Sequence, residues 1–88
     1  MISLKLNSDV KIAREEIQQH IKAPILAVEY DRDCLNFTIS GMYIKSRDIM
    51  FFANTIFEVN QIQYEFDQIS AAVLEDYAVE LDVEFRKI

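Results

Sequence analysis

The sequence predicts an α+β domain in which one antiparallel β-sheet carries helices on one face, in the βαββαβ order of the ferredoxin-like fold. Three observations predict it. Segments with apolar residues at every second position begin and end the chain and form a pair near its middle. Segments with apolar residues three or four positions apart separate them. The chain has 88 residues, one glycine, one proline and no repeat, so we expect a single domain over residues 1–88 with short connections.

The first strand and first helix are predicted from residues 2–24. Residues 2–6 alternate between apolar and polar side chains, which is typical of a half-buried strand. Asn7, Ser8 and Asp9 follow, and their side-chain oxygens can accept the unpaired N–H groups at a helix start. A helical stripe then continues to Pro24, which ends the helix; its members are Val10, Ala13, Ile17 and Ile21.

A hairpin is predicted from residues 25–31 and 34–41, with Arg32 and Asp33 as a two-residue turn. This register places three apolar pairs, one residue from each arm, on one face of the sheet. The predicted pairs are Tyr30 with Leu35, Val28 with Phe37, and Leu26 with Ile39. The turn lacks the favoured Asn-Gly pair, so a longer loop stays open as an alternative.

A second helix in two parts is predicted for residues 46–77. Ser46 can cap its start, and its buried stripe is Ile49, Phe52, Ala53, Ile56 and Phe57. One unbroken helix over residues 47–77 would measure about 46 Å at 1.5 Å per residue, which is too long for so small a domain, so we expect a break near Asn60. The second part, residues 62–77, has a helical stripe of Ile62, Phe66, Ile69, Val73 and Tyr77. Residues 60–66 also alternate like a strand, and the sequence leaves this choice open.

The last strand is predicted at residues 78–86, where acidic residues occupy every second position. Glu80, Asp82 and Glu84 lie between apolar residues, so one face of the strand packs and the other is hydrated. Pairing of this strand with the first would bring Lys5 beside some of these carboxylates. The pattern is compatible with an ordinary solvated face and with an acidic surface for a partner.

Charge is distributed unevenly along the chain. The net charge is −6, and residues 48–85 hold nine acidic residues and no Lys or Arg. A negative field repels nucleic acids and anionic membranes, so we expect no direct contact with either. A polar start, the absence of a 20-residue apolar run and a lone Cys34 indicate a soluble cytoplasmic protein.

Catalytic, cofactor and metal sites find no support in the sequence. His20 is the only histidine and Cys34 the only cysteine, so neither a zinc ligand set nor a Cys–His pair is present. Gly41 stands alone, which excludes a glycine-rich phosphate loop. We therefore expect a protein that is not an enzyme and uses no cofactor or metal.

The predicted function is that of a small acidic interaction protein, homodimeric through apolar residues outside the helical stripes. Phe51 points nearly opposite its stripe, with Met50 at the edge, and Tyr64 lies outside the stripe of the next segment. A first alternative is an acidic inhibitor that mimics nucleic acid toward a basic protein; its charged set is Asp67, Glu75, Asp76, Glu80, Asp82 and Glu84. A second alternative is a small-ligand-binding module.

Overall fold

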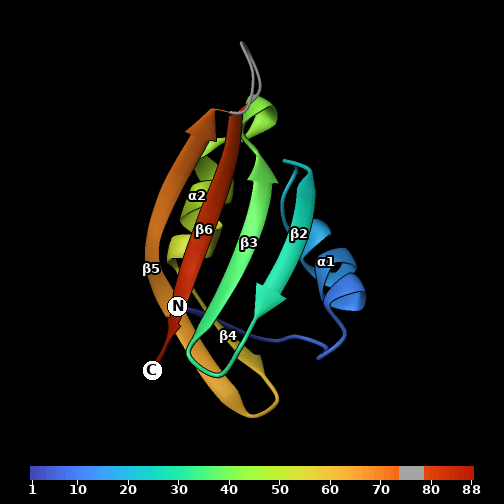
Figure 1. The fold of residues 1–88 in the computed structure, drawn as a ribbon, viewed down its shortest axis with the longest axis vertical. Helices are drawn as coiled ribbons and strands as arrows, with labels where there is room; N and C mark the ends of the chain where they lie inside the picture. The colour runs from blue at the N-terminus through green and yellow to red at the C-terminus, as the bar shows by residue number, and fades with distance from the viewer. Residues whose placement is uncertain (74–78) are drawn as a thin grey trace.

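A computed structural model describes residues 1–73 and 79–88. Over these residues the chain forms six strands, two α-helices and a short 3₁₀ helix (Figure 1). In chain order the elements are β1 (Ile2–Lys5), α1 (Val10–Gln18), β2 (Ile25–Tyr30), β3 (Cys34–Ser40), η1 (Gly41–Tyr43), α2 (Ser46–Ala53), β4 (Thr55–Val59), β5 (Ile62–Val73) and β6 (Val79–Lys87). The chain is therefore α+β, as predicted.

The predicted ferredoxin-like antiparallel sheet is wrong. The six strands form one mixed sheet in the order β1-β4-β5-β6-β3-β2, and it curves into a half-barrel (Figure 1). β1 runs parallel to β4, whereas the other four pairs of neighbours are antiparallel. The order predicted from the sequence differs from this one because the apolar pattern predicts helix over the residues that form β4 and β5.

Residues 62–73 form strand β5 and not the predicted helix, and a β-bulge explains the error. Phe66 pairs with Phe85, but the next inward residue, Ile69, pairs with Val83, because the register shifts between Phe66 and Gln68. A bulge adds one residue to one strand, so inward side chains fall three positions apart instead of two. Ile62, Phe66 and Ile69 are therefore four and three positions apart, which is the spacing of a helical stripe.

The second helix is shorter than predicted, because its last third is strand β4. α2 begins at Ser46, with Lys45 and not Ser46 in the capping position, and it ends at Ala53. Strand β4 follows, and its inward residues Thr55, Phe57 and Val59 are buried at alternate positions. β-Branched residues favour the extended conformation here.

The break predicted near Asn60 is a hairpin turn between β4 and β5. Val59 pairs with Ile62, so Asn60 and Gln61 form a two-residue loop. Both have positive φ angles, 51° and 67°. Positive φ at both central residues is characteristic of the type I′ turn, which matches the twist of the strands it joins.

The predicted hairpin of β2 and β3 is confirmed in most of its register. Tyr30 pairs with Leu35 and Val28 with Phe37. The third pair differs: Ile25 replaces Leu26 opposite Ile39, because the register shifts between Ile25 and Ala27. Leu26 is consequently 50% exposed, whereas Ile25 is buried.

The core fills the concave side of the half-barrel. Both helices contribute to a single cluster with the inward residues of the strands, through Ala13 and Ile17 of α1 and Phe52 of α2. Phe37 lies within 5.2 to 5.6 Å of the rings of Phe52, Phe57 and Phe85. The convex side of β3, β5 and β6 is therefore the side away from both helices.

Helix α1 also protects the β2 edge of the sheet. The Gln18 side chain accepts the N–H of Ile25 at 2.8 Å, and Arg14 donates to the Ile25 carbonyl at 3.3 Å. These contacts occupy backbone groups with which another strand would otherwise pair. No helix of the described residues is long and apolar enough to cross a membrane.

Candidate functional site

A row of three carboxylates crosses the convex face of the sheet on β6. Val83 and Phe85 of this strand are buried, so the alternate residues Glu80, Asp82 and Glu84 point to the convex side. The backbone positions that carry successive carboxylates are about 7 Å apart along the strand, at twice the rise per residue. Because alternate residues of a strand share one face, the three acidic residues of β6 form a row on the convex side.

The residues beside this row are neutral. On one side β3 places Asn36, Thr38 and Ser40 opposite Glu84, Asp82 and Glu80, and on the other β5 places Gln68, Ser70 and Ala72 in the same order. None of these six neighbours carries a charge, so the cross-strand pairs leave the negative charge of the row uncompensated.

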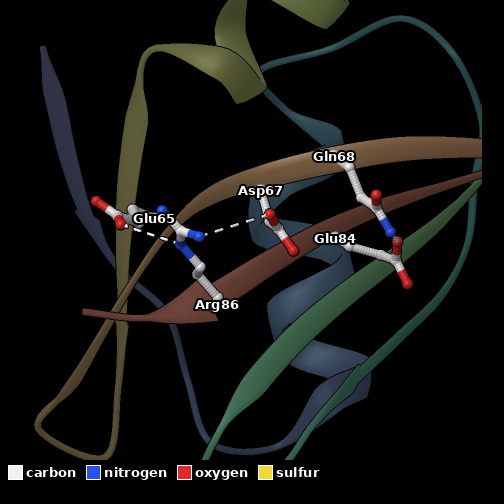
Figure 2. Close-up of polar contacts among 5 residues, drawn as sticks. All are labelled: Glu65, Asp67, Gln68, Glu84 and Arg86. Carbon is white, nitrogen blue, oxygen red and sulfur yellow. Dashed lines mark hydrogen bonds and ion pairs between the residues drawn. The ribbon is translucent and has the colours of Figure 1, made fainter.

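Neutral donors hold two of the three carboxylates in place. Asp82 accepts hydrogen bonds from the Thr38 hydroxyl at 3.1 Å and the Asn36 amide at 3.3 Å. Glu84 accepts one from the Gln68 amide at 2.6 Å, as Figure 2 shows. These bonds fix the positions of the carboxylates, and the donors add no positive charge to the row.

Cations lie only at the margins of this face among the described residues. Arg86 continues the row on β6, but it lies between Glu65, at 3.2 Å, and Asp67, at 3.9 Å (Figure 2). Lys5, expected beside the row, lies on β1 at the far edge of the sheet and pairs with Glu58 at 3.5 Å. The expectation fails because β6 pairs with β5 and β3 and not with β1.

The remaining acidic residues of the predicted set are divided. Asp67 is exposed at the β5 bulge and contacts Arg86. Glu75 and Asp76 lie outside the described residues. The structure therefore brings together Glu80, Asp82 and Glu84, with Asp67 at the end of the row that carries Arg86.

The three predicted interface residues do not form one surface. Met50 is 62% exposed on α2. Phe51 is partly buried and stacks on the His20 ring, with ring centroids 5.1 Å apart. Tyr64 is fully buried, and its hydroxyl donates to the Asp31 carbonyl at 2.6 Å. Only Met50 of the three presents most of its side chain to solvent.

Cys34 lies at the tip of the β2–β3 hairpin beside the Asp31 carboxylate. The Asp31 side chain accepts the N–H groups of Asp33 and Cys34 at 2.8 and 2.9 Å, and these bonds lower the pKa of Asp31. Partial burial, followed by the hydrogen bond to Asp31 and nearby negative charges, raises the pKa of Cys34. A raised pKa reduces the thiolate fraction, so this environment does not activate a nucleophile.

Residues 1–73 and 79–88 contain no group of three His, Cys, Asp or Glu side chains arranged to hold a metal ion. The acidic row does not form such a group because its members extend along one strand.

Sequence reasoning missed the neutral residues that surround the acids. Asn36, Thr38 and Gln68 became relevant only once β3 and β5 were known to flank β6. The alternation of β3 already placed Asn36 and Thr38 on the outer face. No pattern in the sequence placed Gln68 on this face, because the bulge gives β5 a helical spacing of apolar residues and the strand was not predicted.

Comparisons of the chain with protein-family models, with curated proteins and with solved structures found no match.

Proposed function

We propose that this protein is a non-catalytic interaction protein that binds a basic partner protein through the convex face of its sheet. The observation that carries the proposal is the row of Glu80, Asp82 and Glu84, which has neutral neighbours on both sides and hydrogen bonds that position it. A partner with lysine and arginine side chains would supply the missing positive charge.

The class of partner that fits best is a protein whose basic surface binds nucleic acid. Carboxylates on every second residue of an extended strand offer a series of negative charges along one direction, as a phosphate backbone does. A surface built to bind phosphates would accept this row, and the protein would then act as an inhibitor. A cytoplasmic location is part of this proposal.

The predicted homodimer and the small-ligand-binding module remain predictions. Of the three predicted interface residues, Met50 is exposed and stays available to a dimer contact, whereas the burial of Tyr64 removes that side chain from the predicted surface.

The test compares two variants that each remove two negative charges. Glu80→Gln with Glu84→Gln changes the row but leaves Asp82 and its hydrogen bonds intact. Glu15→Gln with Asp33→Asn is the control, because both residues are exposed, the first on α1 and the second in the β2–β3 turn. Immobilised wild type and both variants would be used to capture proteins from an extract of the source cells, and each captured protein would then be purified and titrated.

We expect a basic partner that binds wild type and the control alike. It should bind the row variant roughly tenfold more weakly, since two partly exposed charge pairs together contribute about 1.4 kcal/mol. Binding should weaken with added salt, and nucleic acid should compete with it. Equal binding of all three proteins to every purified partner would contradict the proposal.

A further inference from the structure

A second polar feature lies on a different part of the molecule, between the end of α1 and the start of α2. It is a hollow of about 210 Å³. Its lining residues are Gln19, His20, Ile21, Lys22, Arg47 and Asp48. Three of these side chains are basic, in a protein whose net charge is −6.

The acid in the lining is already engaged by backbone groups. Asp48 is 2% exposed, and its two carboxylate oxygens accept the N–H groups of Lys22 at 3.3 Å and Lys45 at 3.2 Å. Within the described residues, the ion pairs involve Lys5 and Arg86 and neither Lys22 nor Arg47. The two cations thus outnumber the single buried carboxylate of the hollow.

Contacts made by the lining residues themselves hold the walls of the hollow in place. The His20 ring stacks on Phe51 with an angle of 12° between the ring planes. The bond from the Lys22 N–H to the Asp48 carboxylate joins the segment after α1 to the first turn of α2, and the bond from the Lys45 N–H holds that carboxylate at the start of α2. Lys22 and Arg47, which are 25 positions apart in the sequence, are therefore held beside one cavity.

Size and charge together define what the hollow can accept. Pockets for drug-sized ligands measure about 300–1,000 Å³, so this hollow suits a smaller group. Long polyanions are repelled by the net charge of the protein. A tetrahedral oxyanion is small enough, and lysine and arginine donate charge-assisted hydrogen bonds to such groups.

We propose that this hollow binds a small oxyanion of the phosphate class, either as the free ion or as the phosphate of a small monoester. Lys22 and Arg47 supply the positive charge, and His20 contributes a ring N–H. The site is separate from the acidic row, and the proposal does not depend on the function proposed for that row.

The test is a titration of the full chain followed by two-dimensional NMR at low ionic strength. Inorganic phosphate and glycerol phosphate would be added separately, with sodium chloride at matched ionic strength as the reference. The test variant is Lys22→Gln with Arg47→Gln. The control is Lys11→Gln with Arg32→Gln, which removes the same charge from exposed positions on α1 and in the β2–β3 turn. Circular dichroism would verify that each variant is folded.

We expect saturable shifts at residues 19–22 and 45–48, with a Kd on the order of 1 mM, as suits so small a ligand. The test variant should bind at least roughly tenfold more weakly, because it loses two charged donors. The control should bind like wild type. A lower Kd for glycerol phosphate than for phosphate would identify a monoester as the ligand. Shifts that follow ionic strength alone, or that are equal in the test variant and wild type, would overturn the proposal.

Discussion

The two faces of strand β6 differ in how tightly their surroundings constrain them. On the concave face the Phe85 ring lies 5.0 Å from that of Phe57 and 5.8 Å from that of Phe66, in edge-to-face arrangements. On the convex face the neighbouring Glu84 contacts one amide and solvent. Adjacent residues of one strand thus lie in a close-packed interior and on an open surface.

This difference separates the residues that specify the fold from those that are free to serve a partner. The concave side chains are closely packed, so a change in the volume of one of them disturbs the packing of its neighbours. The convex carboxylates interact through hydrogen bonds with neutral groups, and these can change without loss of packing. Mutations on the two faces of β6 should therefore have very different consequences.

The largest effect is expected on the concave face. Phe85→Ala should lower the free energy of unfolding by about 3–5 kcal/mol, since it removes a fully buried ring and leaves a cavity. Chemical denaturation followed by circular dichroism would measure this. A loss below about 1 kcal/mol would show that the cluster collapses around the gap and that the contrast between the faces is smaller than the structure indicates.

The sequence predicted part of the structure on which the contrast between the two faces of β6 depends. The alternation of residues 78–86 predicted both faces of β6 correctly, and Asp9 caps α1 as predicted, by accepting the N–H groups of Lys11 and Ile12. Patterns of this kind are local, because burial on one side fixes the period of apolar residues.

The rest could not be predicted, because it depends on strand partners and on irregular backbone. The bulge near Asp67 gave β5 a helical spacing, and the Asn60–Gln61 turn has no glycine to mark it. The surroundings of the acidic row follow from the pairing of β6 with β3 and β5, which residues far apart in the sequence supply. Local periodicity carries no information about such partners.

A smaller effect is expected from the buried hydroxyl of Tyr64. Tyr64→Phe keeps the ring in the core but removes the 2.6 Å hydrogen bond to the Asp31 carbonyl. We expect a loss of about 1 kcal/mol in the free energy of unfolding, which is typical of one such bond. Burial, with the negative charge of Asp31 as the next cause, raises the pKa of Tyr64, so wild type should also resist ionisation of this phenol in an alkaline titration. A variant as stable as wild type would show that this hydrogen bond contributes nothing to the free energy of unfolding beyond the packing of the ring.

The smallest effect is expected on the convex face. Glu80→Gln with Glu84→Gln should change the free energy of unfolding by no more than about 0.5 kcal/mol, because no packing is lost and repulsion within the row is relieved. The same denaturation experiment as for Phe85→Ala would measure it. A loss of several kcal/mol would mean that these carboxylates support the fold, and the separation of the two faces would then fail.

The parallel pair of β1 and β4 imposes an order on folding. Ile2 pairs with Thr55, so the first strand of the chain has no partner until residues 55–59 have been made. At about 5–20 residues per second, the ribosome needs roughly 3–10 s to supply those residues, far longer than a hairpin needs to form. Closing so long a loop also costs more conformational entropy than closing the short turn of a hairpin. The hairpin of β2 and β3 should therefore form first during synthesis, and β1 should be added to the sheet only after α2 and β4 have emerged.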